Sequence, residues 1–265
     1  MPRYALVTGA SSGIGLALAE ALARRGRNLI LLARQRDALE SIAVELTQRF
    51  SVDVLFRICD LSEPLQLSGL LHELEQNGLV IDLLVNNAGL GSSGDFVAQH
   101  WSQEQDLLEV NVLAVARLCH AIGTRMAGRG NGQILNVASV AAFQPGPGMS
   151  SYDASKAYVL HFSEGLREEL KPHGVKVSVL CPGPTRSAFF RKARLDTRRL
   201  EGGKLMLTAE EVAQIAVRGL ERNRAIIIPG WRNRLLTLAP RLLPRLLTRR
   251  IAARLNRRLQ PLSPR

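Results

Sequence analysis

Short apolar runs alternate with longer amphipathic segments along the first 230 residues of the chain. The runs are almost uninterrupted by polar residues, which is typical of parallel strands that helices cover on both faces. They predict seven strands: Tyr4–Thr8, Asn28–Ala33, Asp53–Cys59, Leu83–Asn86, Gln133–Ala138, Lys176–Cys181 and Ala225–Ile228.

Helical spacing of apolar residues fills the gaps between these strands. It predicts helices over Ile14–Arg25, Arg36–Arg49, Trp101–Ala127, Tyr152–Leu170 and Ala209–Arg222, the last of which follows a capping-box sequence, Thr208 to Glu211. The repeated strand–helix–strand order predicts an α/β fold with a single doubly wound, Rossmann-type parallel sheet and helices on both faces. Such sheets bind ligands at the carboxyl ends of their strands, so residues 1–230 are expected to form one dinucleotide-binding catalytic domain.

The net charge of +12 belongs to the end of the chain. Residues 231–265 contain ten arginines and no Asp, Glu or Lys, so residues 1–230 carry only +2. A composition of 46% hydrophobic and 22% charged residues is typical of a globular protein with a substantial core. The body of the protein is therefore not predicted to bind nucleic acid through its overall charge.

Cysteine and histidine usage argues against disulfides and metals. Cys59, Cys119 and Cys181 lie far apart within apolar runs, which predicts buried free thiols in a reducing compartment. The five histidines have no metal-ligand spacing, so no metal site is expected. The amino terminus enters a strand at once without a signal-peptide pattern, and no uninterrupted apolar run approaches a membrane span. The expected location is cytoplasmic.

A glycine cluster follows the first predicted strand and precedes the first helix. Gly9, Gly13 and Gly15 have the spacing G-x-x-x-G-x-G. Glycines allow a tight turn and close approach of the backbone to a phosphate, and free N–H groups at the helix start attract its negative charge. A strand–helix turn can need glycines for geometry alone, but the context favours phosphate binding. The predicted cofactor loop comprises Gly9, Ser11, Ser12, Gly13, Ile14 and Gly15.

The end of the second strand bears on the choice of cofactor. A fold that binds NAD usually has Asp or Glu there to bind the ribose 2′-hydroxyl, whereas this chain has Ala33 followed by Arg34 and Arg36. A guanidinium pairs well with a 2′-phosphate, while two solvated arginines at a helix start would be disfavoured by the helix dipole. The sequence therefore predicts NADP(H), with Arg34 as a cofactor ligand.

Three polar residues are predicted to meet at the same edge of the sheet. Tyr152 and Lys156 lie four residues apart, on one face of a helix, and Ser139 ends a strand thirteen residues upstream of Tyr152. An ammonium about 4 Å from a phenol contributes roughly 4 kcal/mol at an intermediate dielectric, enough to lower the phenol's pKa by up to about three units. This arrangement suits proton transfer to or from a carbonyl oxygen. Tyr158 is expected to be a core residue instead.

The ordered set of motifs resembles the short-chain dehydrogenase/reductase family, up to about residue 230. The matching positions are Thr8 to Gly15, Asp60, Asn86 to Gly89, Asn111, Ser139, Tyr152, Lys156, and Pro182 with Gly183.

The resemblance implies a role for each matching residue. Asp60 would bind the adenine amino group, with Leu61 beside the ring, and Asn87, Ala88 and Gly89 would support the sheet and the cofactor ribose. Asn111 would hold a water in a proton relay with Lys156, Ser139 would orient the substrate carbonyl, and Tyr152 would donate or accept the proton. Pro182, Gly183 and Thr185 would contact the nicotinamide end, although Thr185 replaces an aliphatic residue and Ser187 replaces the usual Thr.

These features predict an NADP(H)-dependent oxidoreductase that interconverts a carbonyl and a secondary alcohol. A substrate lid is expected at about 186–207, where Phe189 and Phe190 precede several arginines. An apolar or lipid-like substrate would suit this lid, and a solvated lid whose arginines touch nothing is an equal alternative. The alternatives are a 3-oxoacyl reductase and a non-catalytic NADP(H)-binding regulatory protein. The resemblance also implies a homodimer or homotetramer that pairs through the helices near Trp101–Ala127 and Tyr152–Leu170.

The remaining segment, 231–265, is predicted to be a basic amphipathic carboxyl-terminal extension. Its apolar residues recur every four positions and arginines flank them, a pattern typical of helices on anionic membrane surfaces. Packing against the body or a partner subunit, and nucleic-acid contact, are the alternatives; nucleic acid would not need the apolar stripe. Peripheral membrane association is therefore the favoured role. The stripe comprises Leu243, Leu247, Ile251, Leu255 and Leu259.

Overall fold

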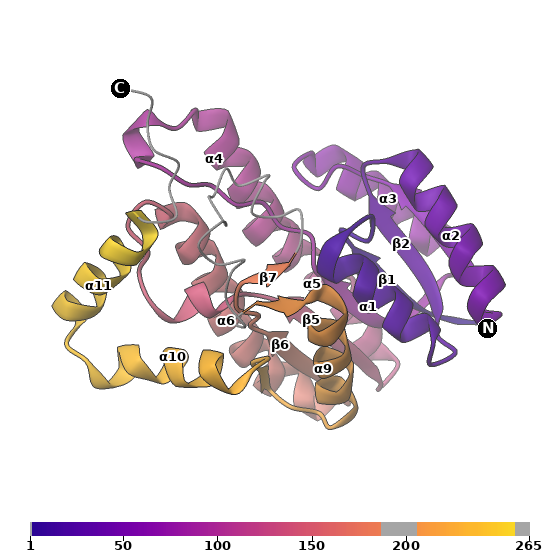
Figure 1. Ribbon diagram of the computed structural model, residues 1–265. Helices are drawn as coiled ribbons and strands as arrows, with labels where there is room; N and C mark the ends of the chain where they lie inside the picture. Colours follow the sequence, from indigo (N-terminus) through magenta and orange to yellow (C-terminus); the bar gives the residue numbers. More distant parts are fainter. Residues whose placement is uncertain (1, 187–205, 258–265) are drawn as a thin grey trace.

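A seven-stranded sheet in which every paired strand is parallel forms the centre of the molecule (Figure 1), in a computed structural model that describes residues 2–186 and 206–257. The strand order β3-β2-β1-β4-β5-β6-β9 reverses direction between β1 and β4. This reversal opens a crevice at the carboxyl ends of the two strands. The strands are β1 (Arg3–Thr8), β2 (Asn28–Ala33), β3 (Val54–Ile58), β4 (Val80–Asn86), β5 (Gly132–Val137), β6 (Val175–Leu180) and β9 (Ile226–Ile227).

Helices cover both faces of the sheet, which confirms the predicted fold class. In β1, Leu6 belongs to the core under α3, α5 and α6, whereas Ala5 and Val7 belong to the core under α1, α2 and α9. The pleat of a strand that is buried on both sides produces this alternation. The helices are α1 (Gly13–Ala23), α2 (Arg36–Phe50), α3 (Pro64–Gln76), α4 (Trp101–Leu108), α5 (Ala114–Gly128), α6 (Ser150–Leu170) and α9 (Ala209–Glu221), with short 3-10 turns η1 (Phe96–Ala98), η3 (Val140–Phe143) and η4 (Lys171–His173).

The long helix predicted over Trp101–Ala127 is interrupted. A π-helical turn, η2 (Glu109–Leu113), separates α4 from α5 and contains Asn111. Hydrophobic periodicity does not reveal such turns, which often occur at functional sites. By length and composition the run Trp101–Gly128 could span a membrane, but half of its most apolar window is buried in the protein.

Several local predictions can be compared directly with the structure. The capping box at the start of α9 is confirmed, because Thr208 Oγ1 accepts a hydrogen bond from the Glu211 amide and the Glu211 carboxylate accepts one from the Thr208 amide. All three cysteines are buried and free. The expectation that Tyr158 is a core residue is wrong: its side chain is 39% exposed and stacks on Phe162 at the surface of α6.

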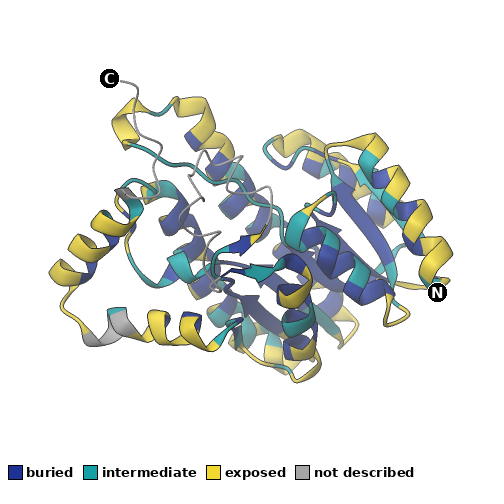
Figure 2. Ribbon diagram, viewed as in Figure 1, coloured by how far each residue is buried: buried dark blue, intermediate teal, exposed yellow. Residues whose placement is uncertain are grey.

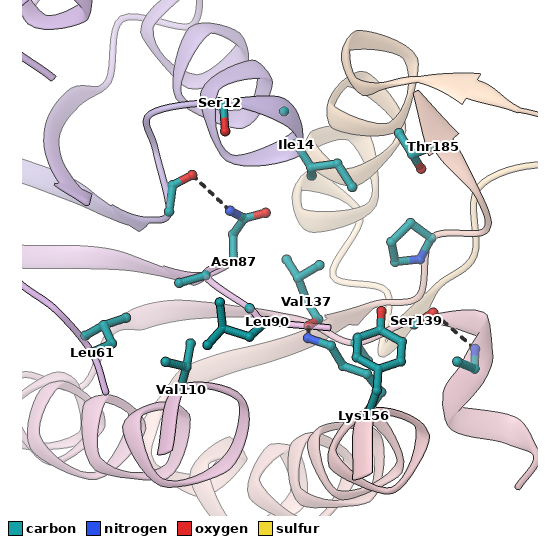
Figure 3. A pocket seen from close by; sticks show the side chains of 18 of the residues that line it. Ser12, Ile14, Leu61, Asn87, Leu90, Val110, Val137, Ser139, Lys156 and Thr185 are labelled. Atoms are coloured by element: carbon teal, nitrogen blue, oxygen red, sulfur yellow. Dashed lines mark hydrogen bonds between the residues drawn. The ribbon is translucent and has the colours of Figure 1, made fainter. Parts of the chain in front are cut away.

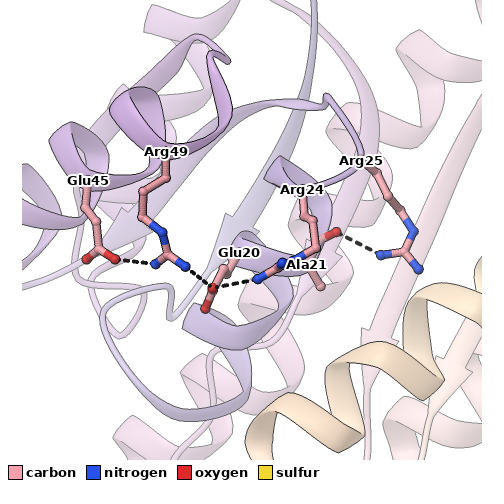
Figure 4. Close-up of polar contacts among 6 residues, drawn as sticks. All are labelled: Glu20, Ala21, Arg24, Arg25, Glu45 and Arg49. Atoms are coloured by element: carbon pink, nitrogen blue, oxygen red, sulfur yellow. Dashed lines mark hydrogen bonds and ion pairs between the residues drawn. The ribbon is translucent and has the colours of Figure 1, made fainter.

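Ion pairs on the surface tie α1 to α2 (Figure 4). Glu20 accepts hydrogen bonds from Arg24 and Arg49, and Arg49 also pairs with Glu45. Exposed pairs of this kind add little stability each, about 0.2–1 kcal/mol. They do hold together the helices of the first two strand–helix–strand units, the first of which carries the glycine loop.

Two further helices, α10 (Trp231–Leu242) and α11 (Arg245–Arg257), lie along one edge of the molecule (Figure 1). A second, two-stranded parallel sheet lies between β6 and α9 in the chain. It pairs β7 (Thr185–Arg186) with β8 (Leu207–Thr208). The predicted lid falls between these strands, and its residues 187–205 lie outside the described part of the chain.

Candidate active site

A cavity of about 400 Å³ opens at the carboxyl ends of the central strands (Figure 3). The glycine loop forms one wall, and residues following β4, β5 and β6 form the others. Among the predicted site residues, only Gly15 and Asn111 do not line it. Those that do are Gly9, Ser11, Ser12, Gly13, Ile14, Arg34, Asp60, Leu61, Asn87, Ala88, Gly89, Ser139, Tyr152, Lys156, Pro182, Gly183 and Thr185.

Backbone geometry explains the three glycines of the loop. Gly9 and Gly13 have φ angles of 65° and 58°, in the left-handed region that favours glycine. Gly15 is needed for close approach, since a Cβ there would stand 2.2 Å from the carbonyl oxygen of Gly9 and 2.4 Å from Nδ2 of Asn87. Gly9 and Gly13 are therefore required by their backbone conformation, and Gly15 by the lack of space for a Cβ.

The start of α1 is available to an anion. Ser12 is the N-cap residue, yet its hydroxyl makes no capping hydrogen bond, and the first turn of the helix has no acidic residue. Unpaired N–H groups and the helix dipole therefore act together at this point. The Ser12 hydroxyl lies beside the cavity in Figure 3. This end of the cavity fits a phosphate group.

Thr8, which sequence reasoning did not single out as a site residue, joins the glycine loop to the end of β4. Its Oγ1 accepts hydrogen bonds from the amides of Asn87 and Ala88, at 3.0 and 2.9 Å. In return, Nδ2 of Asn87 donates to the carbonyl of Thr8 at 2.9 Å. These bonds tie the start of the glycine loop to the loop after β4 at the crevice.

Next to the glycine loop, the cavity carries polar groups at the end of β2. Ser11 Oγ donates to Gln35 Oε1 at 2.9 Å, and Arg34 pairs with Asp60 at 3.3 Å. Burial raises the pKa of the Asp60 carboxyl, but hydrogen bonds from the amide and hydroxyl of Ser62, together with Arg34, outweigh it and hold the pKa below its ordinary value. Asp60 is thus an anion that orients Arg34 beside the cavity.

Ser139, Tyr152 and Lys156 converge on the other half of the cavity. The Ser139 side chain hydrogen-bonds the Tyr152 side chain, and its Oγ accepts from the Ala141 amide at 3.1 Å. Lys156 Nζ donates to the Val137 carbonyl at 3.1 Å and lies 5.9 Å from the centre of the Tyr152 ring. Tyr152 and Lys156 are only 7% and 5% exposed.

The electrostatics of this group differ from the sequence-based expectation. Burial raises the pKa of Tyr152 above its ordinary value, a rise that the Ser139 hydrogen bond only partly offsets. Burial also lowers the pKa of Lys156 to about 8. The predicted lowering of the phenol pKa by the ammonium is therefore not found, because Lys156 points at the Val137 carbonyl and desolvation dominates both groups.

Asn111 lies behind the cavity and is fully buried. Its Nδ2 donates to the Leu90 carbonyl and to Ser155 Oγ, and its Oδ1 accepts from the Leu90 amide, each at 2.9 Å. A Cβ on Gly89 would stand 3.3 Å from Asn111 Oδ1 and 3.2 Å from Lys156 Nζ. The side chain of Asn111 thus fastens the loop after β4 close to Lys156.

Asp153 is a cavity residue that sequence reasoning missed, because an acid in the first turn of a helix is ordinary. It is 5% exposed, and its Oδ1 has no hydrogen-bond partner among the described residues. Its other oxygen lies against Gly146, where a Cβ would stand only 1.8 Å away. Burial raises the pKa of Asp153 to about 7.

Asp153→Asn is expected to flatten the pH dependence of stability between pH 4 and 8. Because the folded pKa of about 7 lies above the unfolded value near 3.9, the protonated carboxyl stabilises the fold fully below about pH 4, and this is lost as the pH rises through 7. The difference amounts to roughly 4 kcal/mol. Denaturant unfolding at several pH values measures it, with exposed Asp106→Asn as the control. An unchanged slope in Asp153→Asn would contradict the assignment.

Comparison with known proteins places the chain in a family. The family model described as short chain dehydrogenase matches residues 3–198. The chain belongs to the short-chain dehydrogenase family. The described residues contain no group of His, Cys, Asp and Glu that could hold a metal ion.

Solved structures of the family resemble this chain over most of its length. A short-chain dehydrogenase from Sphingobium yanoikuyae in complex with NADPH is 35% identical, covers 91% of this chain and 94% of its own, and has a TM-score of 0.82. A bulky-bulky ketone specific alcohol dehydrogenase from Comamonas testosteroni is 33% identical, covers 91% and 92%, and has a TM-score of 0.77. A very-long-chain 3-oxoacyl-CoA reductase from Anas platyrhynchos is 34% identical over 68% of this chain and 58% of its own length.

Proposed function

We propose that this short-chain dehydrogenase is an NADP(H)-dependent carbonyl reductase that acts on bulky, apolar ketones. The observation that carries the proposal is one cavity that brings the phosphate-binding loop, Ser139, Tyr152 and Lys156 together. NADP(H) supplies or accepts the hydride when bound. The protein's own residues orient the carbonyl and move the proton.

In this proposal Tyr152 donates the proton to the carbonyl oxygen. A phenol whose pKa is raised by burial stays protonated at neutral pH, which suits carbonyl reduction better than alcohol oxidation. The Ser139 hydroxyl, hydrogen-bonded to Tyr152, positions the same oxygen. In the proposal Lys156, whose Nζ binds the Val137 carbonyl in this structure, turns toward the phenolate as its negative charge forms, since opposite charges attract strongly in a dry site.

NADP(H) is proposed over NAD(H) because of the residues at the end of β2. Arg34 lines the cavity, and no carboxylate occupies position 33 to repel a 2′-phosphate. Asp60 already pairs with one edge of the Arg34 guanidinium and turns it toward the same end of the cavity as Ser11. The NADPH complex of the Sphingobium relative supports the same choice.

Arg34→Gln is expected to raise the KM for NADPH by roughly 10- to 100-fold and to leave the KM for NADH within a few-fold. The lost interaction is a charged hydrogen bond to a group that only NADPH carries. Steady-state kinetics with both cofactors measure the change. Arg36→Gln is the matched control, because Arg36 is exposed at the start of α2 but does not line the cavity. Equal losses for both cofactors would refute the role of Arg34.

Three observations support a bulky, apolar substrate. The cavity walls include the apolar residues Leu90, Val140 and Met149. The relative from Comamonas is specific for bulky-bulky ketones, and the predicted lid carries Phe189 and Phe190. The second candidate is a 3-oxoacyl thioester, which the relative from Anas favours.

NADPH oxidation measured against bulky ketones, small aldehydes and 3-oxoacyl thioesters tests these substrates. The proposal expects the highest kcat/KM with a bulky ketone. A highest kcat/KM with a 3-oxoacyl thioester would instead assign the thioesters as the substrate class. NADPH binding without oxidation of NADPH by any carbonyl would indicate a non-catalytic regulatory protein.

We also propose pairing of two copies through α4–α5 and α6, where Leu108, Leu113 and Tyr158 are exposed.

A further inference from the structure

The two carboxyl-terminal helices bury polar and small side chains and expose large apolar ones, the reverse of an ordinary surface helix. Among the side chains that the structure describes, those buried in α10 are Asn233 and Thr237, and those buried in α11 are Thr248 and Ala252. A helix on the surface of a globular protein normally buries its large apolar residues and exposes its polar ones. Here the buried residues are polar or small. The described parts of both helices are otherwise largely exposed (Figure 2).

Large apolar side chains of α10 and α11 face outward instead. Among the described residues, half of the exposed large hydrophobic side chains fall in this one segment of 25 residues. An accumulation of exposed large apolar side chains in one segment indicates an interaction site. We call it the tail face; its residues are Trp231, Leu235, Leu236, Leu238, Leu243, Leu246, Leu247, Ile251 and Leu255.

Arginines surround the tail face without any acidic counterpart. In α11, Arg250 and Arg254 each follow an exposed apolar residue, Leu247 and Ile251, by three positions, so they lie along the same stripe. No salt bridge involves an arginine between positions 231 and 256 among the described residues. The exposed arginines are Arg232, Arg234, Arg245, Arg249, Arg250 and Arg254.

We propose that the tail face binds an anionic lipid bilayer, with the apolar side chains in the interface and the arginines on the lipid headgroups. This accounts for both kinds of residue on the tail face: the apolar side chains are buried in the bilayer, and the arginines are attracted to the acidic lipids. A second copy of the chain would bring two sets of arginines together, and nucleic acid would leave the leucines exposed. Trp231, at the start of α10, suits the boundary between apolar and polar regions of a bilayer.

The same helices also touch the walls of the cavity. Asn233 of α10 packs on Gly183, where a Cβ would stand 2.4 Å from its side-chain amide. Asn256 of α11 donates to the Pro147 carbonyl at 3.2 Å and itself lines the cavity. Helix α11 contributes both to the cavity wall, through Asn256, and to the tail face. We therefore infer that an apolar ketone reaches the cavity from the bilayer. This part of the inference rests on the proposed function.

Flotation of the full-length protein with lipid vesicles tests the membrane proposal without reference to activity. We expect binding to vesicles of phosphatidylcholine with 30% phosphatidylglycerol in low salt, and at least tenfold weaker binding to phosphatidylcholine alone. Leu247, Ile251 and Leu255, all changed to Ser, should lower the partition coefficient for acidic vesicles more than tenfold. Arg250→Gln with Arg254→Gln should lower it about 30-fold, at roughly fivefold per arginine.

Two matched variants control for surface changes elsewhere. Leu65→Ser removes an apolar side chain that is 86% exposed on α3, and Arg218→Gln with Arg222→Gln removes two exposed arginines near the end of α9. Neither should alter vesicle binding, and thermal unfolding checks that every variant is folded. The proposal fails if the wild type stays with the unbound fraction, or if the tail variants float as the wild type does. A dimer or a duplex-DNA complex that the same variants abolish, without vesicle binding, would equally overturn it.

Activity then tests the route of the substrate separately. With a bilayer-partitioned ketone, acidic vesicles should raise the kcat/KM of the wild type several-fold and that of the tail variants not at all, while a water-soluble ketone should be reduced equally by both. Equal stimulation of wild type and tail variants would refute entry from the bilayer. An absence of turnover with every carbonyl would refute the proposed function and leave the flotation result standing.

Discussion

Changing Tyr152 to Phe is expected to slow NADPH-dependent ketone reduction by roughly 100- to 10,000-fold, the usual contribution of a positioned general acid. The substitution removes only the hydroxyl, so the ring still fills its buried position on α6. NADPH should therefore bind within a few-fold of the wild-type Kd, as measured by fluorescence titration. Single-turnover measurements at saturating NADPH separate the loss of chemistry from any loss of binding.

Tyr158→Phe serves as the control for this experiment. Tyr158 lies on the same helix but is 39% exposed and stacks on Phe162 rather than lining the cavity. Its loss should change turnover by less than twofold. Turnover retained in Tyr152→Phe would remove Tyr152 from the proposed mechanism, whatever the control does.

Changing Gly15 to Ala is expected to abolish measurable NADPH binding and to destabilise the fold. The new methyl group would lie 2.2 Å from the Gly9 carbonyl oxygen and 2.4 Å from Asn87 Nδ2, so the glycine loop and the end of β4 must separate. Overpacking of this kind costs about 1–3 kcal/mol and displaces the N–H groups aimed at the phosphate. Denaturant unfolding and cofactor titration report the two effects independently.

Gly69→Ala is the matched control on α3. Apart from the adjoining backbone of α3 itself, no atom lies within 4 Å of the position that its Cβ would occupy, so the substitution should leave cofactor binding unchanged. Since alanine is the better helix former, the variant should be more stable by up to about 1 kcal/mol. NADPH binding by Gly15→Ala at the wild-type affinity would show that the loop does not hold the cofactor.

The sequence was sufficient to predict the sheet and most of its helices. All seven strands and five long helical segments follow from apolar periodicity, because residues within one element repeat at the period of its backbone. Helix α3 lies in a gap between predicted strands, where a helix was expected without stated bounds. The π-helical turn around Asn111 was not predicted, because it changes hydrogen bonding without changing the apolar pattern. The order of the motifs also indicated which residues would meet at the crevice, since carboxyl ends of parallel strands share one edge.

Other features depend on which groups surround a residue in space. Burial raises the pKa of Tyr152 and lowers that of Lys156 to about 8, because tertiary packing removes water from both groups. From the sequence, Asp153 is an ordinary acid in the first turn of a helix. In the fold it is buried, and its Oδ1 has no hydrogen-bond partner among the described residues.

The carboxyl-terminal segment divides in the same way. Its composition determined that it is basic, and its four-residue spacing determined that it forms helices with an apolar stripe. Only the tertiary structure decided that Thr248 and Ala252 face the body while Leu247, Ile251 and Leu255 face outward. Periodicity states that a helix has two faces, but which face is buried depends on the shape and chemistry of the surface that receives it.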